Sequence, residues 1–585
     1  MDHPTNKSSG DELSDPSTAE PQVEEGAEVT SLPTNKDPVY MPIEGVQLEE
    51  LEMYQEDGFH PVHLGDKLYN DDYEVVAKLG DGGFGTVWLC MEGPEADGHT
   101  VWRAVKVIAA CASQKENPEL RIIDDLRNEG ITRSQWEEAG ILLPITHFYV
   151  KGPNGEHLCL VFPVMGPSLV SQMGASVDTI KDVLTQAGKS LQFLHDNGIC
   201  HGDFTSDNVL LHIDDVGRIS KNEMIALLEG PTHDVKMADG SEPLSPNAPR
   251  YLVQRGDITN LSPKTQTATI DFGISYQTGD PPEFVGVPAR YAAPEAFFRL
   301  GNTGPTSDVW SYICMIMEIR CRAMFYNTSK RSEYVKDLQA LLGPLPDSYR
   351  LAWKTELAHE GVVDDDEDND FVSMTEEEYK RQRQDAAEQS GYADYLQGLI
   401  GAAQEHVVYQ RDADYTPSPT KVTWRVPEEE VYQLADLFQK VLKYDPDERI
   451  RIGEVLQHEW FQVGKATEDG EKPAKASTTV ATRTSLAGTK GGNVPKTEEK
   501  RVTAIKSTDP SKTPSNADKV RAKPRARPSR IPIATKEPLG IDSEGARVYY
   551  DQQWKDRDIG EVRERRHHPQ AVAQAIARIV TQRAK

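Results

Sequence analysis

HGDFTSDNVLL, residues 201–211, is the most informative stretch of this sequence. It holds Asp203 and, five residues later, Asn208, and it ends in a short apolar run. An aspartate can orient a hydroxyl group and accept its proton, and the amide oxygen of an asparagine suits Mg²⁺. Asp and Asn in a loop are more often ordinary turn residues, so the stretch is informative only if other phosphate- or metal-binding residues accompany it.

A second carboxylate stands in IDFG, residues 270–273, at the end of TQTATI (residues 265–270), a run with the composition of a strand. Asp271 at the end of such a strand can bind a Mg²⁺ ion that bridges the phosphates of a nucleotide. A carboxylate together with an amide oxygen suits this hard cation. The sequence therefore predicts that Asn208 and Asp271 are metal ligands.

GDGGFGTV, residues 80–87, contains the pattern GxGxxG between two expected strands. Glycines let a loop approach phosphates closely, with backbone N–H groups facing the anion. The pattern alone is a weak signal, because a Gly-rich hairpin turn has the same composition. A dinucleotide-binding fold needs a helix after the loop, whereas Thr86 to Cys90 has the composition of a strand. This favours a flap over the phosphates of ATP.

Lys106 follows on a strand, in the apolar run Ala104-Val105-Lys106. A lysine there can bind the α- and β-phosphates of ATP and pair with a glutamate on a helix. The alternative is an exposed lysine on an edge strand. We expect Glu119, in PELRII, to be the partner, and Glu116 is the alternative partner.

These four signals occur along the chain in the order glycine loop, lysine, Asp–Asn pair and IDFG, each in the context that it requires. That order predicts ATP-dependent phosphoryl transfer with Mg²⁺. The catalytic residues that we expect are Asp203, Lys106, Asn208 and Glu119.

Three downstream residues have the pattern of structural supports. Ala293-Pro294-Glu295 ends the segment after Asp271, and Arg449 in DPDERI is the expected ion-pair partner of Glu295. Asp308, in SDVWS, is expected to brace the catalytic loop from the start of a helix. These three distinguish the C-lobe of a protein kinase from other phosphate-binding proteins.

The spacing of apolar residues changes near residue 168. Before it, short β-branched runs predict five strands, over 73–80, 86–93, 101–109, 141–150 and 157–165, and one helix over 116–130. After it, helical spacing recurs over 177–198, 307–324, 431–446 and 452–461. We therefore expect an α+β fold of two lobes: a five-stranded antiparallel N-lobe with one main helix, and a mainly helical C-lobe with inserts.

Composition sets the expected domain boundaries. They are an acidic disordered region over 1–50, the N-lobe with its lead-in segment over 51–162, the C-lobe over 163–461, and a basic low-complexity tail over 462–585. Two inserts interrupt the C-lobe, at about 214–267 and 361–389, and the second contains the acidic run Asp364 to Asp368.

Charge is unevenly distributed along the chain. The formal net charge is −30, but residues 463–585 hold 26 Lys and Arg against 15 Asp and Glu, which leaves 38 against 79 before them. An acidic body attracts basic partners and repels nucleic acid, although it can also serve only solubility. The polar N-terminus and the lack of a long apolar run predict a soluble intracellular protein. The six cysteines show no CxxC spacing, so neither a disulfide framework nor a zinc site is expected.

From Tyr73 to Phe461 the sequence resembles the eukaryotic protein kinase family, and within it the serine/arginine-rich-protein (SR-protein) kinases, especially those of fungi. Four features carry the narrower resemblance. They are GFHPV with LGD at 58–66, KLG with TVWL at 78–89, HLCLVFPVMG at 157–166, and the long insert between Asn208 and Asp271.

The resemblance implies transfer of the γ-phosphate of ATP to Ser in Arg/Ser-rich splicing proteins. It implies basic protein substrates as partners, no membrane, no direct contact of the kinase domain with nucleic acid, and a cytoplasmic or nuclear location. The ATP contacts that we expect on this basis, with Phe162 as gatekeeper, are Leu79, Gly80, Gly82, Gly83, Phe84, Gly85, Val87, Ala104, Lys106, Phe162, Val164, Met165 and Leu210.

Three positions depart from the usual kinase pattern. Gly202 stands where most kinases have an Arg that contacts a phosphorylated activation loop. SR-protein kinases also lack this Arg, so we expect activity without loop phosphorylation. Thr205 replaces the catalytic-loop Lys, so a positive charge near the γ-phosphate is missing. Pro163 replaces a frequent hinge Glu, which is tolerable because adenine contacts there are mainly made by the backbone.

Two alternatives to a protein kinase remain open. His-Gly-Asp also occurs in small-molecule phosphotransferases, but these lack the ordered VPARYAAPE and SDVWS segments. A pseudokinase that binds nucleotide without turnover is supported by Thr205. In the tail, the basic cluster over 519–530 is either an import signal, an RNA contact or a solvated linker, and 571–585 could form an amphipathic helix.

Overall fold

The computed structural model describes residues 39–241, 245–282, 285–326, 331–359, 374–392, 394–402, 404–411, 417–462, 538–541 and 547–550. Packing divides the chain into one unit of Met1–Gly464 with Lys536–Lys585 and a second unit of Lys465–Thr535. The second unit lies outside the described residues. So do the predicted acidic run at 364–368, the basic cluster at 519–530 and the predicted helix at 571–585.

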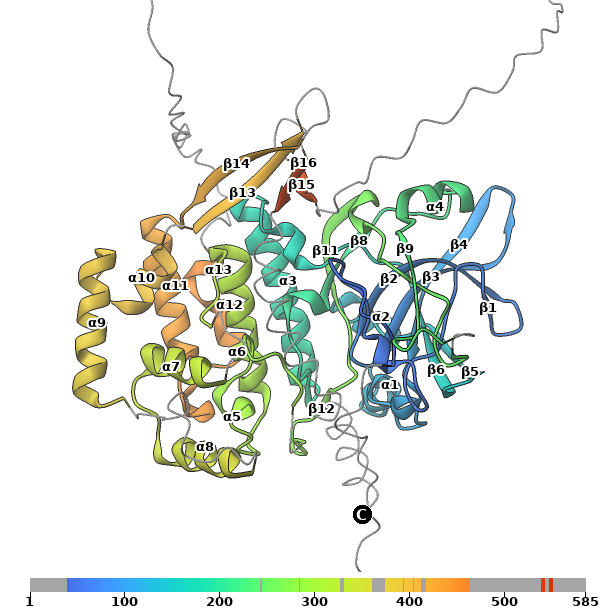
Figure 1. Ribbon diagram of the computed structural model, residues 1–585. Helices are drawn as coiled ribbons and strands as arrows, with labels where there is room; N and C mark the ends of the chain where they lie inside the picture. Colours follow the sequence, from blue (N-terminus) through green and yellow to red (C-terminus); the bar gives the residue numbers. More distant parts are fainter. Residues whose placement is uncertain are drawn as a thin grey trace, which may run out of the picture. The chain divides into compact units, whose positions relative to one another are not determined.

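The N-lobe is built on one antiparallel sheet with the strand order β1-β2-β3-β4-β6-β5 (Figure 1). Its strands are β1 (Lys67–Leu68), β2 (Tyr73–Gly82), β3 (Gly85–Ala96), β4 (His99–Ile108), β5 (Thr146–Gly152) and β6 (Gly155–Phe162). The prediction of five strands was wrong, because the short edge strand β1 adds a sixth by pairing with the start of β2. Two residues are too few to show an alternating pattern.

Helix α1 (Pro118–Asn128) packs beside this sheet, with Leu120 against the cluster of Ile108 and Leu158. Asn117 caps its first turn by accepting a hydrogen bond from the backbone N–H of Glu119, and Pro118 occupies the first helical position, where no N–H is needed. Its apolar side chains share a cluster with Phe272 and with Trp136 of α2 (Arg133–Glu138), a short helix that the sequence did not predict. The cluster joins α1 to the IDFG loop.

The C-lobe is mainly helical, with its largest apolar cluster around α3, α6 and α11. Its helices are α3 (Val177–Asp196), α5 (Pro294–Phe297), α6 (Pro305–Ile316) with the π-helical turn η6 (Met317–Cys321), α7 (Arg331–Leu342), α8 (Asp347–His359), α9 (Glu376–Ser390), α10 (Tyr395–Gly401), α11 (Glu428–Val441), α12 (Ile452–Gln457) and α13 (Glu459–Gln462). Short 3₁₀ turns are η1 (Leu51–Met53), η2 (Ala110–Ala112), η3 (Leu169–Gln172), η4 (Ser206–Asn208) and η8 (Pro446–Glu448).

Two small ladders hold the loops that carry the candidate catalytic residues. Strands β8 (Val209–Ile213) and β11 (Pro263–Thr269) pair antiparallel on either side of the first insert. Strands β7 (Ile199–Cys200) and β12 (Tyr276–Gln277) also pair antiparallel. The HGDF stretch therefore lies between β7 and β8, and IDFG lies between β11 and β12. A separate sheet has the order β14-β13-β16-β15, formed by β13 (Gln404–Arg411), β14 (Pro417–Trp424), β15 (Pro538–Ile541) and β16 (Arg547–Tyr550).

The first insert packs on the N-lobe, although it interrupts the C-lobe in sequence. It forms α4 (Lys221–Leu228), β9 (Thr232–Asp234), β10 (Tyr251–Val253) and η5 (Ile258–Asn260). Met224 and Leu228 of α4 are buried in one cluster with Val76 and Leu89 of the sheet. Figure 1 draws α4 beside β2 and β4 accordingly.

The lead-in segment, residues 39–66, is the other layer on the N-lobe. Tyr40, Leu48 and Tyr54 are buried in a cluster that includes Leu252 of the insert. Residues 39–50, which the sequence placed in the disordered N-terminal region, are thus packed against the lobe. Their buried apolar residues are spaced irregularly, so no strand or helix pattern announced them.

Candidate active site

Lys106 is the centre of the phosphate side of the site. It lies on β4, and its Nζ is 2.5 Å from Glu119 Oε1 on α1 and 2.7 Å from Asp271 Oδ1 in the IDFG loop. The structure thus pairs Lys106 with Glu119; Glu116, the alternative partner, is exposed before the capped start of α1. One ammonium group therefore links the sheet, the helix and the candidate metal loop.

The charges of these three groups depend on one another. Burial acts to lower the pKa of Lys106, but the carboxylates of Asp271 and Glu119 raise it above its usual value overall. Burial raises the pKa of Glu119, while Lys106 partly offsets that effect. Burial also acts on Asp271, yet Lys106 holds the pKa of that carboxyl below its usual value. Lys106 and Asp271 are therefore charged at neutral pH.

Asp271 adopts a backbone conformation that is uncommon for a residue with a side chain. Its φ is 64°, in the left-handed region. Such conformations persist where surrounding contacts enforce them, and they are frequent at functional sites. Here Phe272 is buried against α1, and Lys106 contacts the carboxylate of Asp271. The side chains of both residues are therefore held in place.

The glycine loop is a tight hairpin between β2 and β3. Gly82 pairs with Gly85, which places Gly83 and Phe84 at the turn. The carbonyl of Phe84 accepts a hydrogen bond of 2.8 Å from the backbone N–H of Ala109, which ties the turn to the end of β4. A Cβ atom on Gly85 would lie 2.3 Å from the carbonyl oxygen of Val107, so this position requires glycine.

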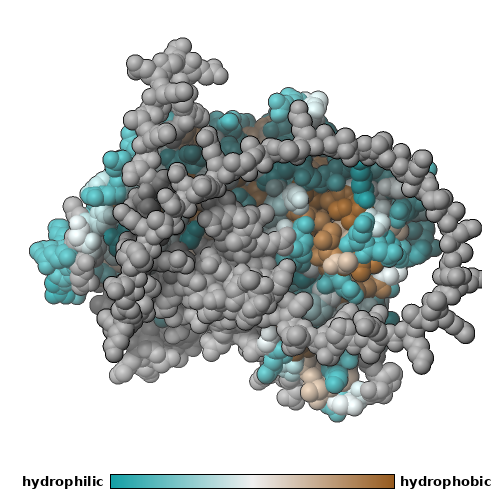
Figure 2. Space-filling model, turned by 90° about the horizontal axis from the view of Figure 1, so that it is seen from above, coloured by the Kyte–Doolittle hydropathy of each residue, from teal (hydrophilic) through white to brown (hydrophobic). Residues whose placement is uncertain are grey.

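The sheet register brings several of the predicted ATP contacts together. Val87 lies opposite Lys106, and Ala104 lies opposite Phe162. Leu79 and Val164 belong to the apolar cluster that also includes the insert helix α4, and Met165 is buried next to Val164. Several members of this cluster are only half-buried, and Figure 2 shows apolar surface gathered on the N-lobe side of the face drawn there.

Leu210 lies on the C-lobe side of these residues. It is half-buried on β8, opposite Ala268 of β11, and it forms an isolated bridge with Ser168 after the hinge. Gly80 and Gly82 lie at the end of β2, with Gly82 exposed. The structure thus places the predicted contacts on β2, β3, β4, the hinge and β8.

Asp203 and Asn208 contact each other in the loop between β7 and β8. The side-chain amide of Asn208 donates to the carbonyl oxygen of Asp203 at 2.8 Å and to its Oδ2 at 2.9 Å. The amide oxygen of Asn208 is thereby the atom that suits a cation. The other carboxylate atom, Asp203 Oδ1, is buried and has no hydrogen-bond partner within the described part of the chain.

The electrostatic setting of Asp203 is unfavourable for a carboxylate. Burial is the main cause that raises its pKa, to about 7, and the charges of Asp271, Asp207 and Asp308 add to it, while the hydrogen bond from Asn208 lowers it. Thr205, which is buried two residues later, supplies no charge to balance this group. A carboxylate with a pKa near the operating pH can act as a general base.

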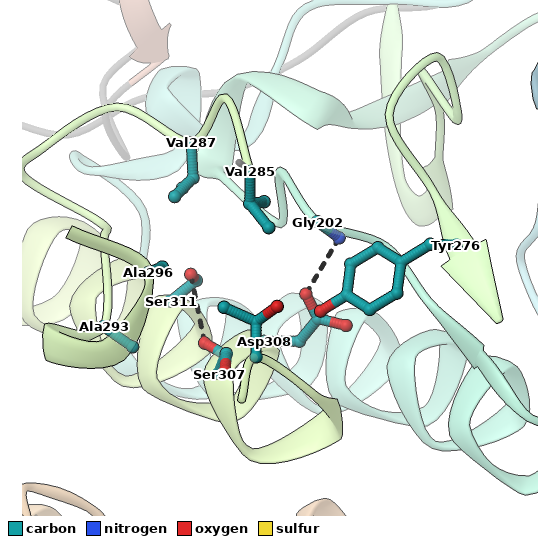
Figure 3. A pocket seen from close by; sticks show the side chains of 10 residues that line it. Gly202, Tyr276, Val285, Val287, Ala293, Ala296, Ser307, Asp308 and Ser311 are labelled. Carbon is teal, nitrogen blue, oxygen red and sulfur yellow. Dashed lines mark hydrogen bonds between the residues drawn. The ribbon is translucent and has the colours of Figure 1, made fainter. Parts of the chain in front are cut away.

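Asp308 braces the catalytic loop, as the sequence predicted. Its carboxylate accepts hydrogen bonds from the backbone N–H groups of His201 at 2.8 Å and Gly202 at 3.0 Å, and it contacts the ring of His195 at 3.0 Å. Figure 3 shows Asp308 beside Gly202 in a small hollow, partly open to solvent, between the catalytic loop, Tyr276 and the start of α6. Gly202 has a φ of 81°, and a Cβ there would lie 2.8 Å from the carbonyl oxygen of Ile274.

The predicted ion pair between Glu295 and Arg449 is present. Two parallel hydrogen bonds of 2.7 Å join the guanidinium to the carboxylate, and both side chains are fully buried. Ser307 donates to the same carboxylate at 2.6 Å. This pair connects α5 to the turn before α12.

Two supports of the loop were missed by the sequence reasoning. His201 Nε2 contacts the carbonyl oxygen of Ile270 at 3.0 Å, and its Nδ1 accepts from the backbone N–H of Asp203 at 3.2 Å, which joins the two catalytic loops. Ser206 and Tyr291 both donate to the buried carboxylate of Glu318. An unusual Glu in the apolar run MIMEIRC was the available signal for the second support.

The residues present suit ATP with Mg²⁺. Within the described residues no group of three or more His, Cys, Asp or Glu could hold a metal by itself. Mg²⁺ in kinases is bound through one or two protein oxygens together with the phosphates of the nucleotide, and Asp271 and Asn208 offer that set. No helix in the described part of the chain is long and apolar enough to cross a membrane.

Comparison with known proteins agrees with this geometry. The protein kinase domain family model matches residues 73–236 and 260–461. The protein kinase dsk1 of Schizosaccharomyces pombe is 32% identical over 223 residues, which are 37% of this chain and 40% of that protein.

Two further relatives match over a longer part of this chain. The serine/threonine-protein kinase SRPK of Physarum polycephalum is 24% identical over 71% of this chain and 91% of its own length. The human dual specificity protein kinase CLK2 is 24% identical over 68% of this chain and 65% of its own length. The family model and these relatives confirm the resemblance inferred from the motifs. This chain therefore belongs to the protein kinase family, with similarity to the SRPK and CLK kinases, and its class is that of the protein serine/threonine kinases.

Proposed function

We propose that this chain uses ATP and Mg²⁺ to phosphorylate serine in basic Arg/Ser-rich proteins. The single observation behind the proposal is the contact of Lys106 with both Glu119 and Asp271, because kinases need the lysine–glutamate pair and the metal-binding Asp in place together. Asp203 and Asn208 complete the set beside them.

Each residue has a role that follows from its surroundings. The ammonium of Lys106 binds the α- and β-phosphates, and Glu119 positions it. Asp271 and Asn208 would hold Mg²⁺ through their side-chain oxygens, and the bound ion would neutralise charge that develops on the transferred group. Asp203 Oδ1, which has no hydrogen-bond partner among the described residues, is the acceptor for the proton of the serine hydroxyl.

The substrate class rests on charge and on the relatives. Residues before 463 hold 79 Asp and Glu against 38 Lys and Arg, and such an acidic body attracts basic substrates. One relative bears the name SRPK, and the long insert after Asn208 is one of the features in which the sequence resembles the SR-protein kinases. A location in the cytoplasm, the nucleus or both belongs to the same proposal.

The test is phosphorylation of an Arg/Ser-repeat peptide beside a neutral and an acidic peptide of equal length, each containing serine. We expect the Arg/Ser peptide to have the highest kcat/KM. Equal rates on all three would refute the substrate class and leave a general protein kinase. Phosphorylation of small molecules in place of all three peptides would point to a small-molecule phosphotransferase.

A pseudokinase is the second candidate, and one observation favours it. The carboxylate of Asp203 lies close to the charges of Asp271, Asp207 and Asp308, and the buried Thr205 places no positive charge beside it. Mg·ATP binding and turnover should therefore be measured on the same preparation, with Asp203→Ala as the baseline. Nucleotide binding without turnover above this baseline would establish the pseudokinase.

A further inference from the structure

Lys78 is a fully buried lysine that lies just before the glycine loop. Burial of an ammonium group is costly unless the charge is paired. Two carboxylates provide the pairing: Glu49 of the lead-in segment, which forms a short contact with Lys78 Nζ, and Asp81, whose Oδ1 is 3.0 Å from the same atom. Lys78 therefore joins the lead-in segment to the glycine loop.

The lead-in side of this contact is fixed. The side chain of Glu49 is 1% exposed, and its second oxygen accepts a hydrogen bond of 2.9 Å from the hydroxyl of Tyr54. Tyr54 is itself 1% exposed, and its carbonyl oxygen accepts from the hydroxyl of Tyr40 at 3.1 Å. The carboxylate of Glu49 thus has both oxygens occupied and cannot rotate freely.

The loop side is the part that handles the nucleotide. Asp81 lies between Gly80 and Gly82, and its side chain is 23% exposed. The register of β2 against β3 shifts before Ala77 and again between Lys78 and Gly80. Such bulges change the direction in which side chains point. They explain how Lys78 faces the lead-in segment although its strand continues into the glycine loop. The insert contributes as well, since the backbone N–H of Gly256 donates to the carbonyl oxygen of Lys78 at 3.0 Å.

We propose that Glu49, acting through Lys78 and Asp81, is a positioning residue that sets the glycine loop over the phosphates of the bound nucleotide. A loop of glycines gains precision only from what holds its ends, because its own backbone is permissive. Gly85 and Phe84 hold the β3 end against β4, and the chain Glu49–Lys78–Asp81 holds the β2 end. This inference rests on nucleotide binding as proposed above.

The first experiment compares Glu49→Gln with Glu56→Gln in the full chain. Glu56 is exposed in the same segment, so it is a matched control for loss of one carboxylate. We expect the Kd for Mg·ATP to rise about tenfold in Glu49→Gln, equivalent to about 1.4 kcal/mol, and to stay unchanged in Glu56→Gln. At saturating ATP the kcat should remain within about twofold of the parent chain, since the catalytic groups are untouched. An unchanged Kd in a folded Glu49→Gln protein would overturn the proposal.

The second experiment substitutes Asp81, whose side chain is partly exposed, in the parent chain and in a Lys78→Met chain that is first shown to be folded. Asp81→Asn should raise the Kd for Mg·ATP in the parent chain but have no further effect in a chain that carries Lys78→Met, because the two residues act through one contact. Additive effects of the two substitutions would refute the link through Lys78.

Thermal unfolding of each variant separates positioning from stability. A positioning role predicts that the loss of ATP affinity persists at temperatures where the variant is fully folded. A double variant, Glu49→Gln with Lys78→Met, removes both charges and should recover stability more than ATP affinity. If the parent chain binds no nucleotide, the proposed function and this inference both fail; if it binds nucleotide and Glu49→Gln does so equally well, this inference alone fails.

Discussion

The two halves of the candidate active site differ in how their charges are balanced. On the nucleotide side, the ammonium of Lys106 contacts the carboxylates of Glu119 and Asp271. On the hydroxyl side, Asp203 is half-buried, lies near other carboxylates and receives a hydrogen bond from the side-chain amide of Asn208. The charges around Lys106 form an ion network, whereas no cation lies beside the carboxylate of Asp203 in the described part of the chain.

The difference separates two abilities that kinases usually combine. Balanced charges around Lys106 prepare a site for nucleotide and metal, whereas transfer also needs stabilisation of charge near the γ-phosphate. Thr205 stands where a lysine usually supplies it. Nucleotide binding and turnover are therefore expected to respond to different substitutions in this chain.

Asp203→Asn has the largest expected effect on turnover. If Asp203 is the general base, as proposed above, its loss should lower kcat by about 10²- to 10⁴-fold. The Kd for Mg·ATP should change by less than about threefold, because Asp203 does not contact Lys106. Single-turnover kinetics and nucleotide titration on the same protein measure the two quantities. A variant that keeps parental kcat would remove Asp203 from the mechanism.

Thr205→Lys should raise kcat by adding a positive charge on the hydroxyl side of the site. A cation beside the transferred group is comparable to a preorganised donor in an oxyanion hole, so kcat is expected to rise by about 10²- to 10³-fold. Thr205→Val is the matched control, since it alters the same buried position without adding charge. Equal kcat in the lysine variant and the parent chain would mean that another group already supplies the stabilisation.

Glu119→Gln tests the balanced half. The substitution weakens a charged hydrogen bond to Lys106, and the loss of about 1.5–3 kcal/mol predicts a fall of about 10- to 100-fold in kcat/KM for ATP. Glu116→Gln removes an exposed carboxylate from the same region and should leave kcat/KM unchanged. A stronger effect of Glu116→Gln would contradict the pairing seen in the structure.

The sequence was sufficient to predict which residues gather at the candidate active site, because their motifs follow one another in the order expected for a kinase. Lys106, Asp203, Asn208 and Asp271 lie on strands or loops that short-range patterns identify, and the structure brings them to one place. The sequence also contained the information needed to choose Glu119 over Glu116. Asn117 followed by Pro118 is a helix-start signal, which puts Glu116 outside the helix.

Long-range packing was not predictable in the same way. Glu49 lies in a polar region whose composition indicates disorder, and Lys78 looks like an ordinary strand lysine. Their contact exists because the lead-in segment and the insert both cover the N-lobe sheet, which no local period encodes. For the same reason the insert was assigned to the C-lobe by its position in the sequence.

The pH dependence of catalysis gives the smallest and most specific effect. Because the folded protein raises the pKa of Asp203 to about 7, its carboxylate is largely protonated at pH 6 and largely ionised at pH 8. A base must be ionised to accept the serine proton, so kcat/KM should rise about tenfold over this interval. Thr205→Lys should move the midpoint to lower pH, because a nearby cation favours the ionised form. The residual activity of Asp203→Asn should lack this rise; a rise of equal size in that variant would assign the titration to another group, such as the nucleotide itself.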